Sequence, residues 1–247
     1  MKRLKKTKII ATLGPSTSTF ESIENLIKEG VDVLRINFSH STHKEAKFLI
    51  KSIREINHSM STNIAILADL QGPKLRIGEV DKNTQLSDGD KVLIKTDKGF
   101  KGNEKKLYLN YQNLGEDIKK NEKILIDDGK IILKVLNINN KNEVLTEVMQ
   151  GGELSSNKGF NLPNTFLSQP ALTDKDIDDA IFSAKHNVDW IALSFVRKGS
   201  DIKSLVKLLE KNTDHRIPVI AKIEKPEGVK NIDEIMKYAS GIMVARG

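Results

Sequence analysis

Apolar and polar positions alternate between strand-like and helix-like periods through the first 78 residues of the chain. An apolar run at residues 9–13 precedes Ser18-Thr19-Phe20-Glu21, which has the spacing of a capping box and predicts a helix ended by Gly30. The next expected elements are a strand at 33–38, a helix begun by a capping box at Thr42-His43-Lys44-Glu45, and a strand at 64–70. Strands separated by such helices are parallel and joined by right-handed crossovers.

The pattern changes between residues 79 and 166, where short β-like runs follow one another without a convincing helix. The runs lie at residues 91–96, 105–111, 123–126, 131–138 and 143–149. Asp127-Asp128-Gly129-Lys130 is a hairpin signal, and a second turn is expected at residues 139–142. We expect a small antiparallel β-domain, inserted between a strand and the next helix.

The strand–helix alternation resumes after residue 164 and gives three more strands. The predicted domains are a first barrel part at 1–78, the insert at 79–166 and a second barrel part at 167–247. The fold class is therefore α/β. Six strands are too few for a closed (β/α)8 TIM barrel, which needs at least ~200 residues. We expect an incomplete barrel of about six βα units.

Composition excludes several classes of protein. The chain has no Cys, which excludes disulfides and thiolate chemistry and fits a cytoplasmic location. No apolar stretch approaches the ~20 residues of a membrane span. The net charge of +7 is spread among both signs except at the basic N-terminus, and aromatic residues are few. We therefore expect neither a nucleic-acid nor a membrane partner.

Polar side chains gather where the predicted parallel strands end. Arg35, Asn37 and Ser39 alternate along strand two and so face one way. A guanidinium there can hold a phosphate, and the two oxygen-bearing side chains can hold a hard cation. For Arg35 alone, a buried structural ion pair is an equally good interpretation. Asp69 adds a carboxylate at the end of strand three, and Lys74 and Arg76 add positive charge just beyond it.

The motif Ala221-Lys222-Ile223-Glu224 closes strand five and places an ammonium and a carboxylate on the same side. Ligands of parallel α/β folds bind at this end of the strands. Lys222 can neutralise an oxyanion there, and Glu224 can bind a divalent metal. An isolated Lys-x-Glu is more often a structural pair. Charged groups at several strand ends favour the functional interpretation.

At these residues the chain resembles the N-terminal half of the pyruvate kinases. Six motifs match in order, and they are Lys8–Ser16, Arg35–His40, Asp69–Arg76, Lys158–Pro163, Ala221–Glu224 and Gly241–Gly247. The resemblance implies transfer of the phosphoryl group of phosphoenolpyruvate to ADP, giving ATP and pyruvate in glycolysis. It also implies that the insert is a β-barrel lid domain, that the full-length protein is a homotetramer and that Mg²⁺ is a cofactor.

The resemblance also assigns roles by residue. Arg35 and Lys222 are the implied catalytic residues, with Arg35, Lys222 and Gly247 binding substrate. Glu224 is the implied Mg²⁺ ligand, and the implied K⁺ ligands are Asn37, Ser39, Asp69 and Leu70. The implied nucleotide contacts are Asn37, Phe38, Ser39, His40, Arg76 and Lys158.

Three departures from the family pattern stand out. Lys74 occupies a position where K⁺-dependent members have Glu, so its ammonium is expected to replace K⁺ and leave weak or no K⁺ dependence. Ser41 stands where Gly is usual. The second Mg²⁺ carboxylate of the family follows Gly247, outside this sequence, so activity of these 247 residues alone is doubtful. Two alternatives remain, a non-catalytic fragment and a Mg²⁺-dependent lyase or aldolase barrel acting through an enolate.

Overall fold

The chain folds as two compact units. The computed structural model describes residues 6–73, 75–97 and 100–245. Unit 1 combines Met1–Pro73 with Ala171–Gly247, and unit 2 is Lys74–Pro170. The divisions thus fall at 73/74 and 170/171, where the sequence pattern suggested 78/79 and 166/167.

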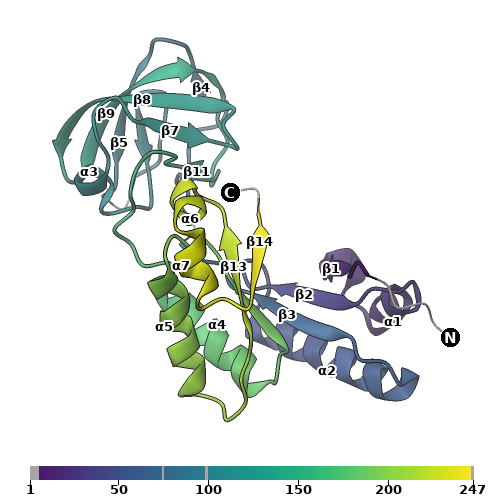
Figure 1. The fold of residues 1–247 in the computed structure, drawn as a ribbon. Coiled ribbons are helices and arrows are strands. Elements are labelled where there is room, and N and C mark those ends of the chain that lie inside the picture. Colours follow the sequence, from purple (N-terminus) through teal and green to yellow (C-terminus); the bar gives the residue numbers. More distant parts are fainter. Residues whose placement is uncertain (1–5, 74, 98–99, 246–247) are drawn as a thin grey trace. The chain divides into compact units, whose positions relative to one another are not determined.

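Unit 1 is built on a parallel six-stranded sheet in the order β1-β2-β3-β12-β13-β14 (Figure 1). Its strands are β1 (Ile10–Thr12), β2 (Val33–Asn37), β3 (Ala65–Asp69), β12 (Trp190–Leu193), β13 (Val219–Ile223) and β14 (Gly241–Val244). Every strand pair in this sheet is parallel, as the alternation predicted. The carboxyl ends of all six strands therefore share one edge of the sheet.

Helices pack on this sheet and form the core of unit 1 with it. They are α1 (Phe20–Lys28), α2 (His43–Met60), α4 (Asp174–Lys185), α5 (Gly199–Glu210), α6 (Pro226–Lys230) and α7 (Ile232–Met236), preceded by the short 3₁₀ helix η1 (Pro15–Thr17). Ile23, Ile53 and Leu205 are completely buried where α1, α2 and α5 meet the sheet. Each such side chain contributes about 1.5–3 kcal/mol when removed from water.

The sequence predicted capping boxes at the starts of α1 and α2, and the structure has the expected N-cap in α2 but not in α1. Thr42 and Glu45 form the expected reciprocal capping box at the start of α2. The same expectation at α1 is wrong by one residue, because Thr19, not Ser18, is the N-cap and accepts a hydrogen bond from the Ser22 amide at 3.2 Å. The end of α1 is confirmed, since Gly30 follows it with a φ of +97°.

The last helical segment of unit 1 is broken rather than continuous. Asn231 separates α6 from α7, and its side-chain amide donates to the Arg197 carbonyl at 2.8 Å. Val229 and Met236 face outward in this segment, at 63% and 51% exposure. Ile235 is completely buried in the core, and Ile232 packs against it.

Unit 2 is a β-domain with its own apolar core. Its main sheet has the order β11-β7-β8-β9-β5-β6, and β4 pairs separately with β10. The strands are β4 (Gln85–Leu86), β5 (Lys91–Lys95), β6 (Lys106–Tyr108), β7 (Lys123–Ile126), β8 (Ile131–Asn140), β9 (Glu143–Gln150), β10 (Gly152–Glu153) and β11 (Phe160–Asn161). The hairpin between β7 and β8 is confirmed, with positive φ angles at Asp127, Asp128 and Gly129.

Two features of unit 2 differ from a purely antiparallel design. β5 and β6 pair in parallel, so they do not form a hairpin. A short helix, α3 (Leu114–Asp117), interrupts the strands. Leu114 at its start is completely buried, so this turn closes one part of the core.

Among the described residues, no helix combines the length and the apolar composition that a bilayer span requires.

Candidate active site

A cluster of charged side chains lies at the carboxyl ends of β2, β3 and β13 in unit 1. Asp69, at the end of β3, is 1% exposed and forms ion pairs with two basic side chains. Arg35 donates from Nε to Asp69 Oδ2 at 2.7 Å, and its Nη2 also pairs with that oxygen. Lys222 Nζ lies 3.1 Å from Asp69 Oδ1. Two basic side chains from strands far apart in the sequence therefore meet at one carboxylate.

Strand alternation explains how these side chains reach the same place. In β2, Leu34 and Ile36 enter the core while Arg35 projects from the other face. In β13, Ala221 and Ile223 are buried and Lys222 lies between them. Register then completes the arrangement, because Thr12 of β1 is opposite Arg35, and its Oγ1 accepts from Arg35 Nη1 at 2.7 Å.

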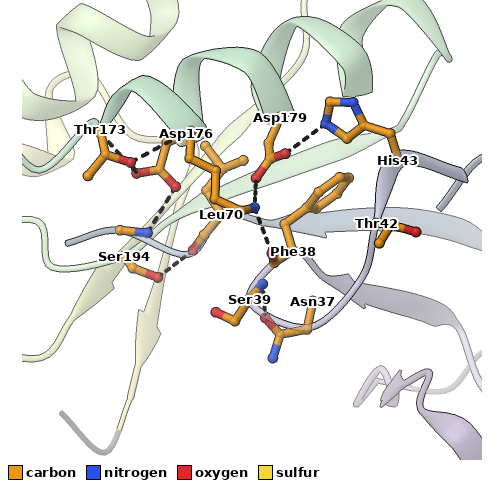
Figure 2. Close-up of polar contacts among 12 residues, drawn as sticks. Asn37, Phe38, Ser39, Thr42, His43, Leu70, Thr173, Asp176, Asp179 and Ser194 are labelled. Carbon is orange, nitrogen blue, oxygen red and sulfur yellow. Dashed lines mark hydrogen bonds and ion pairs between the residues drawn. The ribbon is translucent and has the colours of Figure 1, made fainter. Parts of the chain in front are cut away.

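Lys222 connects the cluster to the neighbouring strand ends. Its Nζ donates to Ser194 Oγ at 2.7 Å and lies 3.6 Å from Glu224 Oε1. Ser194 in turn donates to the Leu70 carbonyl at 2.7 Å (Figure 2). Arg35, Lys222, Asp69 and Glu224 carry two positive and two negative charges, which balance. A divalent cation bound there would give the cluster the positive charge that attracts a phosphoryl group.

Glu224 fits the role of a metal ligand. Its Oε2 accepts a hydrogen bond from the Phe195 amide at 2.8 Å, which fixes one oxygen of the carboxylate. Mg²⁺ is bound in proteins by one or two carboxylates together with substrate oxygens and water, so a single protein carboxylate suits it. Among the described residues there is no group of three or more acidic or His side chains that could hold a metal ion.

The end of β2 and the turn after it carry four residues expected to bind nucleotide and, in part, K⁺: Asn37 closes the strand, and Phe38, Ser39 and His40 form the turn. Asn37 Oδ1 accepts from the Ser39 amide at 3.0 Å, and the Phe38 amide donates to the Asp69 carbonyl at 3.0 Å. The four expected K⁺ ligands thus lie on the adjacent ends of β2 and β3. The oxygens of Asn37, Asp69 and Leu70 each accept a hydrogen bond within the protein.

A buried carboxylate of α4 supports this turn, and reasoning from the sequence missed it. Asp179 accepts from Lys175 Nζ at 2.5 Å and contacts His43 Nε2 at 2.8 Å. Lys175 also donates to the Phe38 carbonyl at 2.8 Å. The rings of His43 and Phe182 stack with centroids 4.2 Å apart. The Lys–Asp spacing of four residues on a helix was the available signal.

A pocket of about 1010 Å³ lies beside the turn after β2. Its walls come from the loop after β1, from Asn37 and His40, and from the first turns of α2. Two of the expected nucleotide-contacting residues therefore line a cavity large enough for a nucleotide.

Arg76 and Lys158, the other two expected nucleotide contacts, belong to unit 2. Arg76 forms a β-bridge with Gly159, and its Nη1 donates to the Asn157 carbonyl. Lys158 Nζ lies 3.0 Å from Asp127 Oδ1. Hydrogen bonds from Lys130 and Lys158 lower the pKa of Asp127. The two basic residues therefore come from neighbouring segments of one unit. Lys74 and Gly247 lie outside the described residues.

Comparison with known proteins agrees with this arrangement. The family model described as pyruvate kinase, barrel domain, matches residues 4–247. The chain is 42% identical over 246 residues to a pyruvate kinase of Staphylococcus saprophyticus and 39% identical over 245 residues to one of Staphylococcus haemolyticus. It is also 41% identical over 244 residues to a pyruvate kinase of Corynebacterium glutamicum.

These matches cover 98–99% of the chain. The chain spans 42% of the length of the two staphylococcal proteins and 51% of the corynebacterial one. None of the three relatives is described as a lyase or an aldolase, so that alternative has no support from them. With a family model that matches nearly every residue, the chain belongs to the pyruvate kinase family.

Proposed function

We propose that this chain carries the phosphoenolpyruvate site of a pyruvate kinase, which transfers a phosphoryl group to ADP and yields ATP and pyruvate. The observation that carries the proposal is the meeting of Arg35, Asp69, Lys222 and Glu224 at the carboxyl edge of a parallel sheet. Ligands of such sheets bind at this edge. Family membership of the chain supports the same reaction.

The reaction asks the protein mainly for positioning and for charge neutralisation. The bond between phosphorus and the enol oxygen of phosphoenolpyruvate breaks as a β-phosphate oxygen of ADP bonds to phosphorus. Arg35 would hold the phosphoryl group bidentately. Lys222 would stabilise the negative charge left on the enolate oxygen, and addition of a proton to that enolate gives pyruvate.

Glu224 would bind Mg²⁺ in this scheme. When bound, Mg²⁺ supplies positive charge to the oxygens of substrate and phosphoryl group. Glu224 itself stays oriented by the Phe195 amide, and its other oxygen faces Lys222 across 3.6 Å. ADP would occupy the pocket of unit 1 beside Asn37 and His40. Arg76 and Lys158 stay the other expected nucleotide contacts.

The same proposal extends to architecture. The parallel sheet of unit 1 would be six strands of a (β/α)8 barrel, unit 2 would act as its lid, and the complete protein would be a cytoplasmic homotetramer. The four K⁺ ligands would be Asn37, Ser39, Asp69 and Leu70. With Lys74 nearby in the sequence, we expect weak or no dependence on K⁺; activity rising tenfold or more on adding K⁺ would contradict this.

The test is a lactate-dehydrogenase-coupled assay with phosphoenolpyruvate, ADP and Mg²⁺, applied to the 247 residues and to the full reading frame that contains them. The variants are Arg35→Met and Lys222→Met, with Arg54→Met as the matched control. Arg54 is also ion-paired, to Asp189 at 3.0 Å, but lies at the opposite ends of the strands. Loss of one transition-state contact to a charged group costs about 10²–10³ in kcat.

We expect the full reading frame to be active, the two site variants to lose at least 100-fold in kcat/KM, and Arg54→Met to stay within about threefold of the unaltered protein. Equal activity of Lys222→Met and the unaltered protein would remove the catalytic assignment. An inactive full reading frame, folded by circular dichroism, would favour a non-catalytic role.

A further inference from the structure

The backbone of Phe195 adopts a conformation that is unusual for an aromatic residue. Its φ angle is +56°. The other non-glycine residues with positive φ in the described part of the chain are all Ser, Asn or Asp, which tolerate the left-handed region. A bulky residue held there costs of order 1–3 kcal/mol, and such strain persists where the surroundings enforce it.

The residues on both sides of Phe195 are fixed by hydrogen bonds. Ser194 donates from Oγ to the Leu70 carbonyl at 2.7 Å, and the Val196 amide donates to the Lys222 carbonyl at 3.3 Å. Ser194 and Val196 are almost completely buried. The chain therefore turns at Phe195 between two anchored neighbours.

Gly72 packs directly against the Phe195 ring. A Cβ atom on Gly72 would lie 2.8 Å from Phe195 Cδ2 and 2.8 Å from Ser194 Cβ, closer than real Cβ contacts come. Gly72 is itself held in place, because its amide donates to Asp176 Oδ1 at 2.9 Å. Asp176 is completely buried, and its other oxygen accepts from the Thr173 amide and hydroxyl at the start of α4 (Figure 2).

The turn at Phe195 directs its amide at Glu224. That amide donates to Glu224 Oε2 at 2.8 Å. Asp176, Gly72, Phe195 and Glu224 thus form a continuous series of contacts from the start of α4 to the candidate metal ligand. A residue with an ordinary backbone conformation at position 195 would turn its amide elsewhere and leave Glu224 free to rotate.

We infer that Phe195 is a positioning residue for divalent-metal binding, with its ring held against Gly72 so that its amide fixes the Glu224 carboxylate. This inference rests on the proposed role of Glu224 as metal ligand. Partners that orient a metal ligand contribute about 10- to 100-fold to metal affinity. The ring is the essential part, because glycine would adopt the left-handed backbone without strain but would not be held there by packing.

The test measures binding of Mn²⁺ alone, as a paramagnetic substitute for Mg²⁺, from the electron paramagnetic resonance signal of the free ion. The protein is the full reading frame that contains the chain. The variants are Phe195→Gly, Phe195→Tyr, Gly72→Ala and Glu224→Gln. Gly89→Ala is the control for Gly72→Ala. Both glycines have a left-handed φ, +68° at Gly72 and +87° at Gly89, but nothing lies within 4 Å of the Cβ position of Gly89.

We expect Phe195→Gly and Gly72→Ala to weaken Mn²⁺ binding about tenfold or more. Phe195→Tyr, which keeps the ring, should retain affinity within about twofold, and so should Gly89→Ala. Glu224→Gln should abolish binding. Circular dichroism and urea midpoints identify any variant that does not fold, and Phe195→Gly and Gly72→Ala serve as independent tests.

The possible failures are distinguishable. If Glu224→Gln binds Mn²⁺ as well as the unaltered protein, or if the unaltered protein binds none, the proposed metal site is wrong and this inference falls with it. If Glu224→Gln abolishes binding while folded Phe195→Gly and Gly72→Ala bind normally, the metal site stands and the positioning role of Phe195 is wrong.

Discussion

Replacing Asp69 by Asn should destabilise unit 1 far more than the same change at an exposed aspartate. The substituted amide would keep an oxygen that accepts a hydrogen bond but lose the charge that Arg35 and Lys222 share. At about 3 Å and an effective dielectric constant of about 20, each attraction is worth about 5 kcal/mol before desolvation is counted. Removing one partner from a buried pair costs about 3–5 kcal/mol. Because the Arg35 side chain is 24% exposed and can turn to water, we expect about 3 kcal/mol.

The assay is urea unfolding at pH 7, followed by fluorescence of Trp190. This residue is the single Trp of the chain and stands in β12 opposite Leu67 of β3, within the sheet of unit 1. The control is Asp189→Asn, whose ion pair with Arg54 is 37% exposed on both sides and should be worth less than about 1 kcal/mol. If Asp69→Asn lowers the free energy of unfolding no more than Asp189→Asn does, the charged cluster is not a coupled, desolvated unit.

Three further changes test other parts of the structure. Burial, with the hydrogen bond to Asp117, raises the pKa of Tyr111. The phenol of the unfolded chain therefore ionises at a lower pH than that of the folded chain, and stability falls as the pH rises above about 10. Tyr111→Phe should remove the contribution of this phenol to the fall of the urea midpoint between about pH 9 and 11. Lys175→Met should lower the free energy of unfolding by about 1–3 kcal/mol, measured by Trp190 fluorescence, because it deprives Asp179 and the Phe38 carbonyl of a hydrogen-bond donor. Its control, Lys185→Met on the exposed last turn of α4, should lower it by less than about 0.5 kcal/mol. Gly115→Ala would place a Cβ 2.5 Å from the Asn140 carbonyl oxygen and should lower the free energy of unfolding of unit 2 by about 1–3 kcal/mol in circular dichroism melts. Gly152→Ala should cost less, because its Cβ would meet only Ile131 Cγ1, at an ordinary 3.6 Å.

Periodicity was sufficient to predict the secondary structure of unit 1 and the parallel order of its strands, because each strand there is a short apolar run bounded by strong helix signals. It failed where tertiary contacts decide. The break at Asn231 depends on a hydrogen bond to the Arg197 carbonyl, from a residue distant in the sequence. The parallel pairing of β5 and β6 depends on a chain crossing that turn residues do not encode.

In the candidate site, too, some residues could be predicted from the sequence, whereas others depend on tertiary contacts. Arg35, Lys222 and Glu224 could be predicted as neighbours because strand ends of a parallel sheet converge. The pairing of Arg35 and Lys222 with Asp69 required the register between strands, which alternation alone does not fix. The supporting residues were harder still: Asp176 and Asp179 look like solvent-facing charges of an amphipathic helix, yet both are buried. The strained backbone of Phe195 has no signature in the sequence at all.

The insertion of unit 2 between β3 and β12 bears on the order of folding. Those two strands are neighbours in the sheet, although residues 70–189 lie between them. Within unit 2 the entering and leaving segments already pair, since the Ile77 amide donates to the Lys158 carbonyl and Arg76 bridges Gly159. Once unit 2 has folded, only short stretches of free chain separate β3 from β12, which lowers the entropy cost of joining them by about 1 kcal/mol. Early folding of the insert would therefore accelerate assembly of the sheet that surrounds it in the sequence.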